Sequence, residues 1–140
     1  MPINIRQDGD GSAGLVGRDG GNGEFITVNI EYTPTTIPKI SFVATRSYVI
    51  KSIMGRVDVA GTDAGAVNAN VLTTLSGSNI AAGASAHTGT FNLKGTASTN
   101  QLLNVVTPSP IVAAGTAIGI TFSGVMTSAT GTVSVCLVPL

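Results

Sequence analysis

The chain has 140 residues, of which 43% are hydrophobic and only 10% are charged, and its formal net charge at pH 7 is zero. This length and composition fit one ordinary domain with a hydrophobic core, and the chain lacks the basic surface of a protein that binds nucleic acid or anionic membranes. One cysteine excludes an internal disulfide. Residues 1–11 contain no apolar region of a secretory signal, and the longest apolar-rich run, residues 111–122, is too short to span a bilayer. We therefore expect neither nucleic acid nor membrane as a partner.

Residues 1–23 are rich in glycine, and we expect them to form an extended arm. Seven glycines lie between Gly9 and Gly23, a density that helices and strands rarely tolerate. The stretch GDGSAG matches the G-x-G-x-x-G pattern of a dinucleotide-binding turn. That turn needs a buried strand before it and a helix after it, but the residues before it are too few and too polar and four more glycines follow. The pattern therefore does not indicate a nucleotide site.

The same segment also resembles a calcium-binding loop. Asp8, Asp10 and Ser12 match the opening positions of such a loop, and Asp19 falls at its twelfth position. However, Ala13 stands where the sharp turn needs glycine, and Asp19 where a bidentate Glu is required. We therefore predict no metal site here.

After residue 23 the pattern becomes that of β-strands. Residues 24–32 (EFITVNIEY) carry apolar side chains at every second position from Ile26, which predicts a half-buried strand. Residues 39–44 and 48–61 predict two further strands. The second is long enough that we expect a bulge or bend near Gly55.

The second half of the chain continues in the same way, with turn signals about every 8 to 12 residues and no helix of ordinary length. Its predicted strands lie in residues 66–75, 79–83, 87–95, 101–106, 116–125 and 131–140. We therefore predict an all-β protein over residues 24–140. Its expected form is a single jelly-roll-like β-sandwich of eight to nine antiparallel strands, preceded by the arm of residues 1–23.

Few residues could carry catalysis. His87 and Cys136 are the one Cys–His pair that the composition allows, but a free cysteine in an alternating strand usually packs as a small hydrophobic residue. Asp58 and Asp63 could act as paired carboxylates in glycoside hydrolysis, although a solvated loop with Asp63 in a turn is the simpler interpretation. We expect no catalytic residue, no cofactor and no metal.

Aromatic side chains, which often stack on sugars, all fall inside predicted strands. Most of them fit core positions, and we expect Tyr48 to be the most exposed. The six are Phe25, Tyr32, Phe42, Tyr48, Phe91 and Phe122. A role in sugar binding is therefore not indicated by this pattern, although it is not excluded.

The chain as a whole resembles the capsid decoration (cement) proteins and related head-fibre bases of tailed bacteriophages. The resemblance is carried by the glycine-rich arm, by a domain with Lys94 as its one charged residue after residue 63, and by the stretches GRVDVAGTDAGAVNANV, FNLKGTASTNQ and AAGTAIGITFSG. It implies a jelly-roll-like domain, often a homotrimer, that is made in the bacterial host cytoplasm. It also implies that the protein binds the major capsid protein on the exterior of the virion, without catalysis.

We expect the arm to make the contacts with the shell or with neighbouring subunits. Twenty-three extended residues reach roughly 75 Å at about 3.3 Å per residue, which is enough to cross a neighbouring subunit. Apolar residues could join a sheet edge, and charged residues could make charge-assisted hydrogen bonds. These candidate contact residues are Ile3, Ile5, Arg6, Asp8, Asp10, Arg18 and Asp19.

Two alternatives remain open. The chain could be part of a phage fibre or tail adhesin that holds a host-surface glycan through its distal loops. It could also be a small β-barrel enzyme of the cupin type, but such an enzyme needs a histidine-rich metal set and the chain has one histidine.

Overall fold

The structure is a computed structural model that describes residues 24–35 and 38–140. The predicted arm, residues 1–23, lies outside this range. All regular elements in the described part are strands, except for one short 3-10 helix, η2 (Ile80–Ala82). The strands are β2 (Ile26–Tyr32), β3 (Lys39–Val43), β4 (Tyr48–Val59), β5 (Asn68–Thr74), β6 (Ala84–Ser85), β7 (Phe91–Asn92), β8 (Thr99–Leu103), β9 (Ile111–Val112), β10 (Ala117–Ser123) and β11 (Thr130–Pro139).

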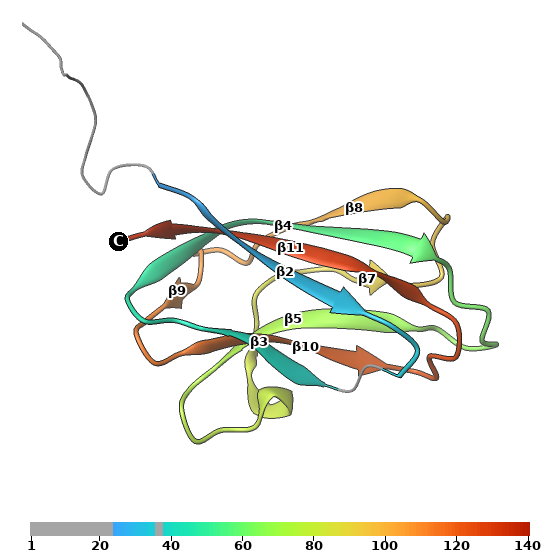
Figure 1. Ribbon diagram of the computed structural model, residues 1–140, viewed down its shortest axis with the longest axis horizontal. Coiled ribbons are helices and arrows are strands. Elements are labelled where there is room, and N and C mark those ends of the chain that lie inside the picture. The colour runs from blue at the N-terminus through green and yellow to red at the C-terminus, as the bar shows by residue number, and fades with distance from the viewer. Residues whose placement is uncertain (1–23, 36–37) are drawn as a thin grey trace, which may run out of the picture.

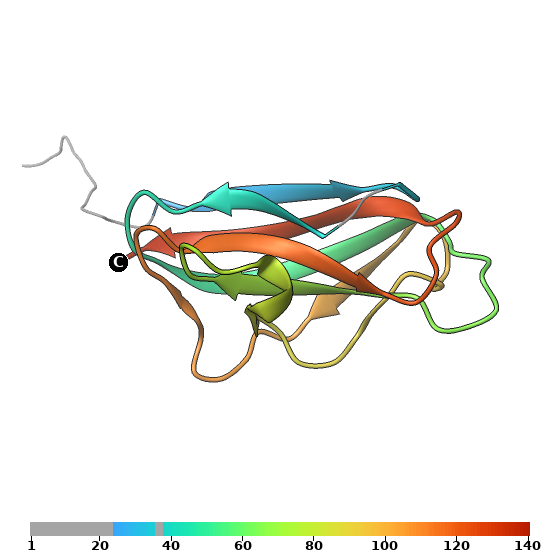
Figure 2. The ribbon, with the colours of Figure 1, turned by 90° about the horizontal axis from the view of Figure 1, so that it is seen from below.

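These strands form two antiparallel sheets that face each other. One sheet has the order β3-β10-β5-β6 with β7 also paired to β5, and the other has the order β2-β11-β4-β8 with β9 also paired to β4. The second sheet lies in the upper half of Figure 1, and Figure 2 looks onto the first sheet with η2 in front. The all-β prediction is confirmed. The described part has ten strands rather than eight to nine, because three of them have only two residues each.

The core lies between the two sheets and follows the alternation predicted from the sequence. In β2, Val28, Ile30 and Tyr32 are buried, and in β11 Val133 and Val135 are fully buried. The ring of Tyr32 packs edge-to-face against Phe91, with 5.9 Å between the ring centroids. Among the described residues, no helix is long and apolar enough to cross a membrane.

Strand β4 contains two irregularities in its pairing with β11. Its pairing with β11 shifts at two places, and these shifts make Lys51 and Asp58 the extra residues of two bulges. The strand thus contains bulges as predicted, but they lie on either side of Gly55 rather than at it. Gly55 instead makes room for the ring of Phe91, because a Cβ atom at this position would lie 2.6 Å from that ring.

The prediction of a strand over residues 79–83 was wrong. They form η2, which the side chain of Asn79 caps by accepting a hydrogen bond from the Ala81 N–H at 2.9 Å. Ile80 is the buried residue of η2 and packs over Gly119 of β10. A short Asn-capped turn thus covers part of the outer face of the β3-β10-β5 sheet.

Candidate interaction surface

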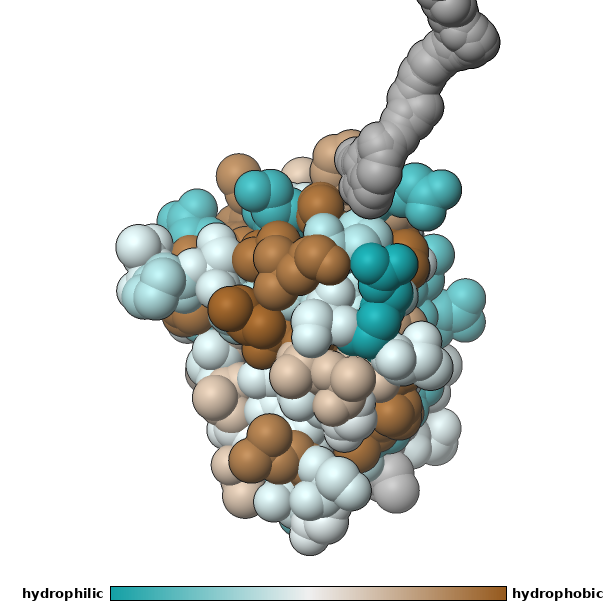
Figure 3. All heavy atoms as spheres, turned by 90° about the vertical axis from the view of Figure 1, so that its left-hand side faces the viewer, coloured by the Kyte–Doolittle hydropathy of each residue, from teal (hydrophilic) through white to brown (hydrophobic). Residues whose placement is uncertain are grey.

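One end of the sandwich carries a group of exposed large hydrophobic side chains. This end holds the start of β2, where residues 1–23 join at Glu24, together with the start of β4, strand β9 and the C-terminus (left in Figure 1). Figure 3 looks onto it and shows hydrophobic residues spread among weakly polar and some strongly hydrophilic ones. We call it the apolar end and define it by five residues that are 58–70% exposed: Phe25, Val43, Leu75, Ile111 and Leu140.

Backbone hydrogen bonds hold the apolar end in place. Ile111 pairs with Val49 of β4, while its neighbour Val112 is fully buried. The Leu140 N–H donates to the Ser47 carbonyl at 3.1 Å, next to the start of β4. The exposed side chains therefore project from a fixed backbone, which reduces the entropy lost when a partner covers them.

A groove of about 390 Å³ lies beside two of these residues. Leu75 and Ile111 form parts of its wall, and Thr74 and Thr116 contribute hydroxyl-bearing side chains. Exposed apolar surface next to a concave surface is typical of a contact site for another protein.

The opposite end, which we call the loop end, consists of the loops 60–67, 93–98 and 124–129. Here the carboxylate of Asp63 accepts hydrogen bonds from the Thr127 hydroxyl at 2.7 Å and from the Thr127 N–H at 3.1 Å. Both bonds lower the pKa of Asp63, and the bond from the hydroxyl has the larger effect. Lys94 Nζ donates to the carbonyls of Asp63 and Gly65. The loops are thus joined to one another by their own side chains.

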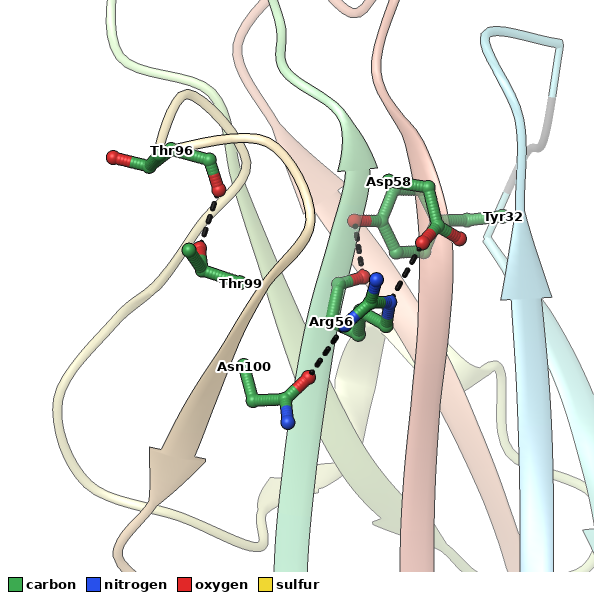
Figure 4. Close-up of polar contacts among 6 residues, drawn as sticks. All are labelled: Tyr32, Arg56, Asp58, Thr96, Thr99 and Asn100. Carbon is green, nitrogen blue, oxygen red and sulfur yellow. Dashed lines mark hydrogen bonds and ion pairs between the residues drawn. The ribbon is translucent and has the colours of Figure 1, made fainter.

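Asp58, the other candidate carboxylate, belongs to a polar cluster on the outer face of β4 (Figure 4). Arg56 Nε donates to Asp58 Oδ1 at 2.8 Å, and Arg56 Nη1 donates to Asn100 Oδ1 at 3.2 Å. From the core side, the Tyr32 hydroxyl donates to the Arg56 carbonyl at 3.2 Å. Burial, with a smaller contribution from Asp58, raises the pKa of Tyr32 far above its ordinary value. The cluster is an ion pair with structural partners, so Asp58 pairs with Arg56 whereas Asp63 accepts hydrogen bonds from Thr127.

The candidate Cys–His pair is not brought together either. The His87 ring is 4% exposed, and its Nε2 accepts a hydrogen bond from the Val71 N–H of β5 at 3.2 Å. Burial lowers the pKa of His87, so the ring is neutral at pH 7. Cys136 lies in the other sheet, between the inward-facing Val135 and Leu137, and so faces outward. In residues 24–35 and 38–140, no group of three or more His, Cys, Asp and Glu side chains could hold a metal ion.

The predicted exposure of Tyr48 was wrong. Tyr48 is 4% exposed because its ring packs edge-to-face on Phe42, with 5.9 Å between the centroids. Phe25 is instead the exposed aromatic residue, at 66%, and it precedes β2 at the apolar end.

The predicted contact residues of the arm all lie outside the described residues. They are Ile3, Ile5, Arg6, Asp8, Asp10, Arg18 and Asp19. The apolar end was not predicted from the sequence. The pattern around Leu75 and Ile111 indicates strands or loops but does not indicate that these side chains are exposed. The available signal was that Leu75 closes a predicted strand and directly precedes a turn.

Comparisons with family models, curated proteins and solved structures find no match. The surface is therefore interpreted from its own geometry. The apolar end is held by backbone bonds, includes a groove and lies where residues 1–23 join the sandwich. The loop end makes its polar contacts within the chain.

Proposed function

We propose that this chain is a non-enzymatic structural protein of a tailed-phage virion, which binds the major capsid protein on the outside of the assembled shell and stabilises it. The observation that carries this proposal is the position of Glu24. Residues 1–23 join the sandwich at the same end as the exposed side chains of Phe25, Ile111 and Leu140. The glycine-rich arm and the apolar end therefore act on one partner, and the loop end faces away from it.

We also propose that the two sheets form a jelly roll, as expected for such a protein. The strand order supports this, because β2 pairs with β11 and β3 with β10, whereas β4 pairs with β8 and β5 with β6. The first two strands of the domain thus pair with its last two, whereas strands from the middle of the chain pair with one another. Two four-stranded paths of this kind correspond to the eight strands of a jelly roll, with β7 and β9 as short additions.

The energetics of docking favour this end. Each Å² of apolar surface removed from water contributes about 25 cal/mol, and uncharged side chains lose little hydration when they are covered. The guanidinium of Arg46, a charged group at this end, already donates to the Leu140 carbonyl at 3.4 Å. A protein that binds only the assembled shell stabilises the assembled state by mass action.

A non-enzymatic role is supported by the chemistry of the described residues. The carboxylates of Asp58 and Asp63 and the imidazole of His87 each have hydrogen-bond partners within the protein. These hydrogen bonds engage the carboxylates and the imidazole that would act as acid or base in hydrolysis or nucleophilic catalysis.

The first experiment is to quantify this chain against the major capsid protein in purified particles of the phage that encodes it, by mass spectrometry. Hundreds of copies in a simple ratio to the shell subunit are expected for a decoration protein. A few copies or a few tens would indicate a fibre or tail component instead. Complete absence from the particles would overturn the proposal.

The second experiment measures binding to shells that lack the protein, by co-sedimentation. Deletion of residues 1–23 should leave a folded domain with lost or strongly reduced binding. The double variant Leu75→Asp and Ile111→Asp should weaken binding at least about tenfold, because it places charges in the apolar contact. The matched control is Leu102→Asp, since Leu102 is also 65% exposed but lies in β8, away from the apolar end. Equal binding by all variants would contradict the proposed surface.

A further inference from the structure

A second concave surface opens on the outer face of the β3-β10-β5 sheet, in the half nearer the loop end. It has a volume of about 280 Å³. Every side chain that lines it is uncharged, and most carry an amide or a hydroxyl group. These polar residues are Asn68, Asn70, Ser85, Thr90, Thr121 and Ser123. We call this surface the polar groove.

The register of β5 and β10 arranges four of these side chains in a regular array. Asn70 is directly opposite Thr121, and Asn68 is directly opposite Ser123. Directly opposed residues lie about 5 Å apart, and residues two apart along a strand lie about 6.7 Å apart on the same face. The array therefore has roughly the footprint of one sugar ring, and it stands on two central, paired strands rather than on loops.

The polar groove is partly preorganised. Ser85 Oγ lies 2.9 Å from Asn70 Oδ1, and its one proton can be donated either there or to the His87 carbonyl, so the Asn70 amide is held beside Ser85. Ser85 Oγ also lies 2.8 Å from the His87 carbonyl. The segment that carries Ser85 is attached to β5 through the buried ring of His87, which accepts the Val71 N–H.

The remaining polar side chains of the groove have unused hydrogen-bonding capacity. Within the described part of the chain, the side chains of Asn68, Thr90, Thr121 and Ser123 make no hydrogen bond. Amides and hydroxyls both donate and accept, as sugar hydroxyls do. An anionic ligand would lack a cation here, and an apolar ligand would leave these groups without partners.

We propose that the polar groove is a binding site for an uncharged sugar residue of a glycan. Asn70 and Thr121 are its central contacts, with Asn68, Ser123 and Thr90 around them. The polar groove shares no lining residue with the groove at the apolar end, so the two are distinct surfaces. This inference does not depend on the proposed binding to a capsid.

The test is a titration of the ¹⁵N-labelled full chain, followed by amide chemical shifts. The probes are glucose, galactose, mannose, rhamnose and N-acetylglucosamine, with a sialylated sugar as the anionic comparison. At least one neutral sugar is expected to bind with a dissociation constant on the order of 1 mM, as suits one sugar ring in an open groove. It should shift the amide signals of residues 68–70, 89–90 and 121–123.

Two variants locate the site. Asn70→Ala and the isosteric Thr121→Val should each weaken binding about five- to tenfold, because each removes a polar contact. The matched control is Asn29→Ala on the other sheet, where Asn29 accepts a hydrogen bond from the Ser134 hydroxyl at 2.7 Å, much as Asn70 does from Ser85. This control should bind like the wild type.

Three results would overturn the proposal. They are the absence of shifts with every neutral sugar, binding of the anionic sugar alone, and unchanged binding in both groove variants. Thr121→Val keeps the shape of the side chain, so loss of binding in a variant with wild-type chemical shifts elsewhere cannot be ascribed to unfolding. Shell binding is measured separately, so a failure here is distinguishable from a failure of the proposed function.

Discussion

The two ends of the sandwich differ in whether their side chains find partners within the chain. At the loop end, Asp63 accepts two hydrogen bonds from Thr127, and Lys94 donates to the Asp63 carbonyl. At the apolar end, Leu75 is 70% exposed and Ile111 is 62% exposed. Leu75 at the apolar end and Asp63 at the loop end both lie in connections between strands, so element type alone does not explain the difference.

The comparison shows where the molecule still has favourable interactions to gain. The polar side chains of the loop end are already bonded to one another, so a partner that binds them would have to replace existing bonds. Val125 is also exposed there, at 66%. The apolar end exposes hydrophobic side chains on a backbone that is already ordered, so a partner gains their burial at a small entropic cost. The following predictions test this contrast, from the largest expected change in stability to the smallest.

The largest effect is expected at two glycines with positive φ, one at each end. A Cβ atom at Gly124 (φ 86°) would overlap the Ala66 carbonyl, whereas one at Gly77 (φ 85°) would meet nothing within 4 Å. Gly124→Ala should therefore lower the free energy of unfolding by about 2–4 kcal/mol, from left-handed strain plus overpacking. Gly77→Ala should cost only about 1–2 kcal/mol, from the strain alone. Urea denaturation measures both, and equal losses would contradict the packed and open character of the two ends.

The middle of the sandwich should respond to pH through His87. Burial lowers its pKa in the folded state below 6.5, so the unfolded chain takes up this proton first as the pH falls. The contribution of His87 to stability is complete above pH 6.5 and declines as the pH drops toward the folded pKa. The slope is at most about 1.4 kcal/mol per pH unit.

The check is to compare the wild type with His87→Gln by urea denaturation between pH 7.5 and 5 (roughly the range over which a histidine changes its charge). The variant lacks the titrating group, so its stability should depend less on pH. Parallel profiles for the two proteins would show that the ring is not held in its neutral form.

A smaller effect is expected from the carboxylate at the loop end. The hydrogen bonds from Thr127 lower the pKa of Asp63 below 3.8, so its contribution is present above that pH and is lost as the pH falls through the folded value. Asp63→Asn should lower the thermal midpoint at pH 7, and the difference from the wild type should shrink in acid. Asp58→Asn is the control, because its exposed pair with Arg56 is worth less than about 1 kcal/mol. If Asp58→Asn lowers the thermal midpoint more than Asp63→Asn does, the hydrogen bonds of Asp63 do not hold the loops together.

The smallest change in stability is expected at the exposed side chain of Ile111. Ile111→Ala should alter the free energy of unfolding by no more than about 0.5 kcal/mol, since the side chain is 62% exposed. Its neighbour Val112 is fully buried, and Val112→Ala should cost about 2 kcal/mol. Chemical denaturation of the two variants tests the boundary between surface and core. A large loss in Ile111→Ala would mean that this residue serves the fold rather than a partner.

Much of the β-structure could be predicted from the sequence, because alternation is a local property. The pattern from Ile26 to Tyr32 predicted the buried face of β2 correctly. The predictions failed where a local pattern had two physical explanations. Gly55 makes room for a ring rather than bending the strand, and residues 79–83 form a capped turn because the Asn79 side chain binds backbone.

The candidate site was less predictable than the fold. The sequence by itself determined that the described part is all-β and that hydrophobic residues alternate along its strands. Only the tertiary structure decided that Tyr48 is covered by Phe42, that Leu75 and Ile111 stay uncovered, and that Asn70 faces Thr121 across two strands. The physical reason is that alternation depends on neighbours in the chain, whereas exposure depends on which distant segment packs against a residue.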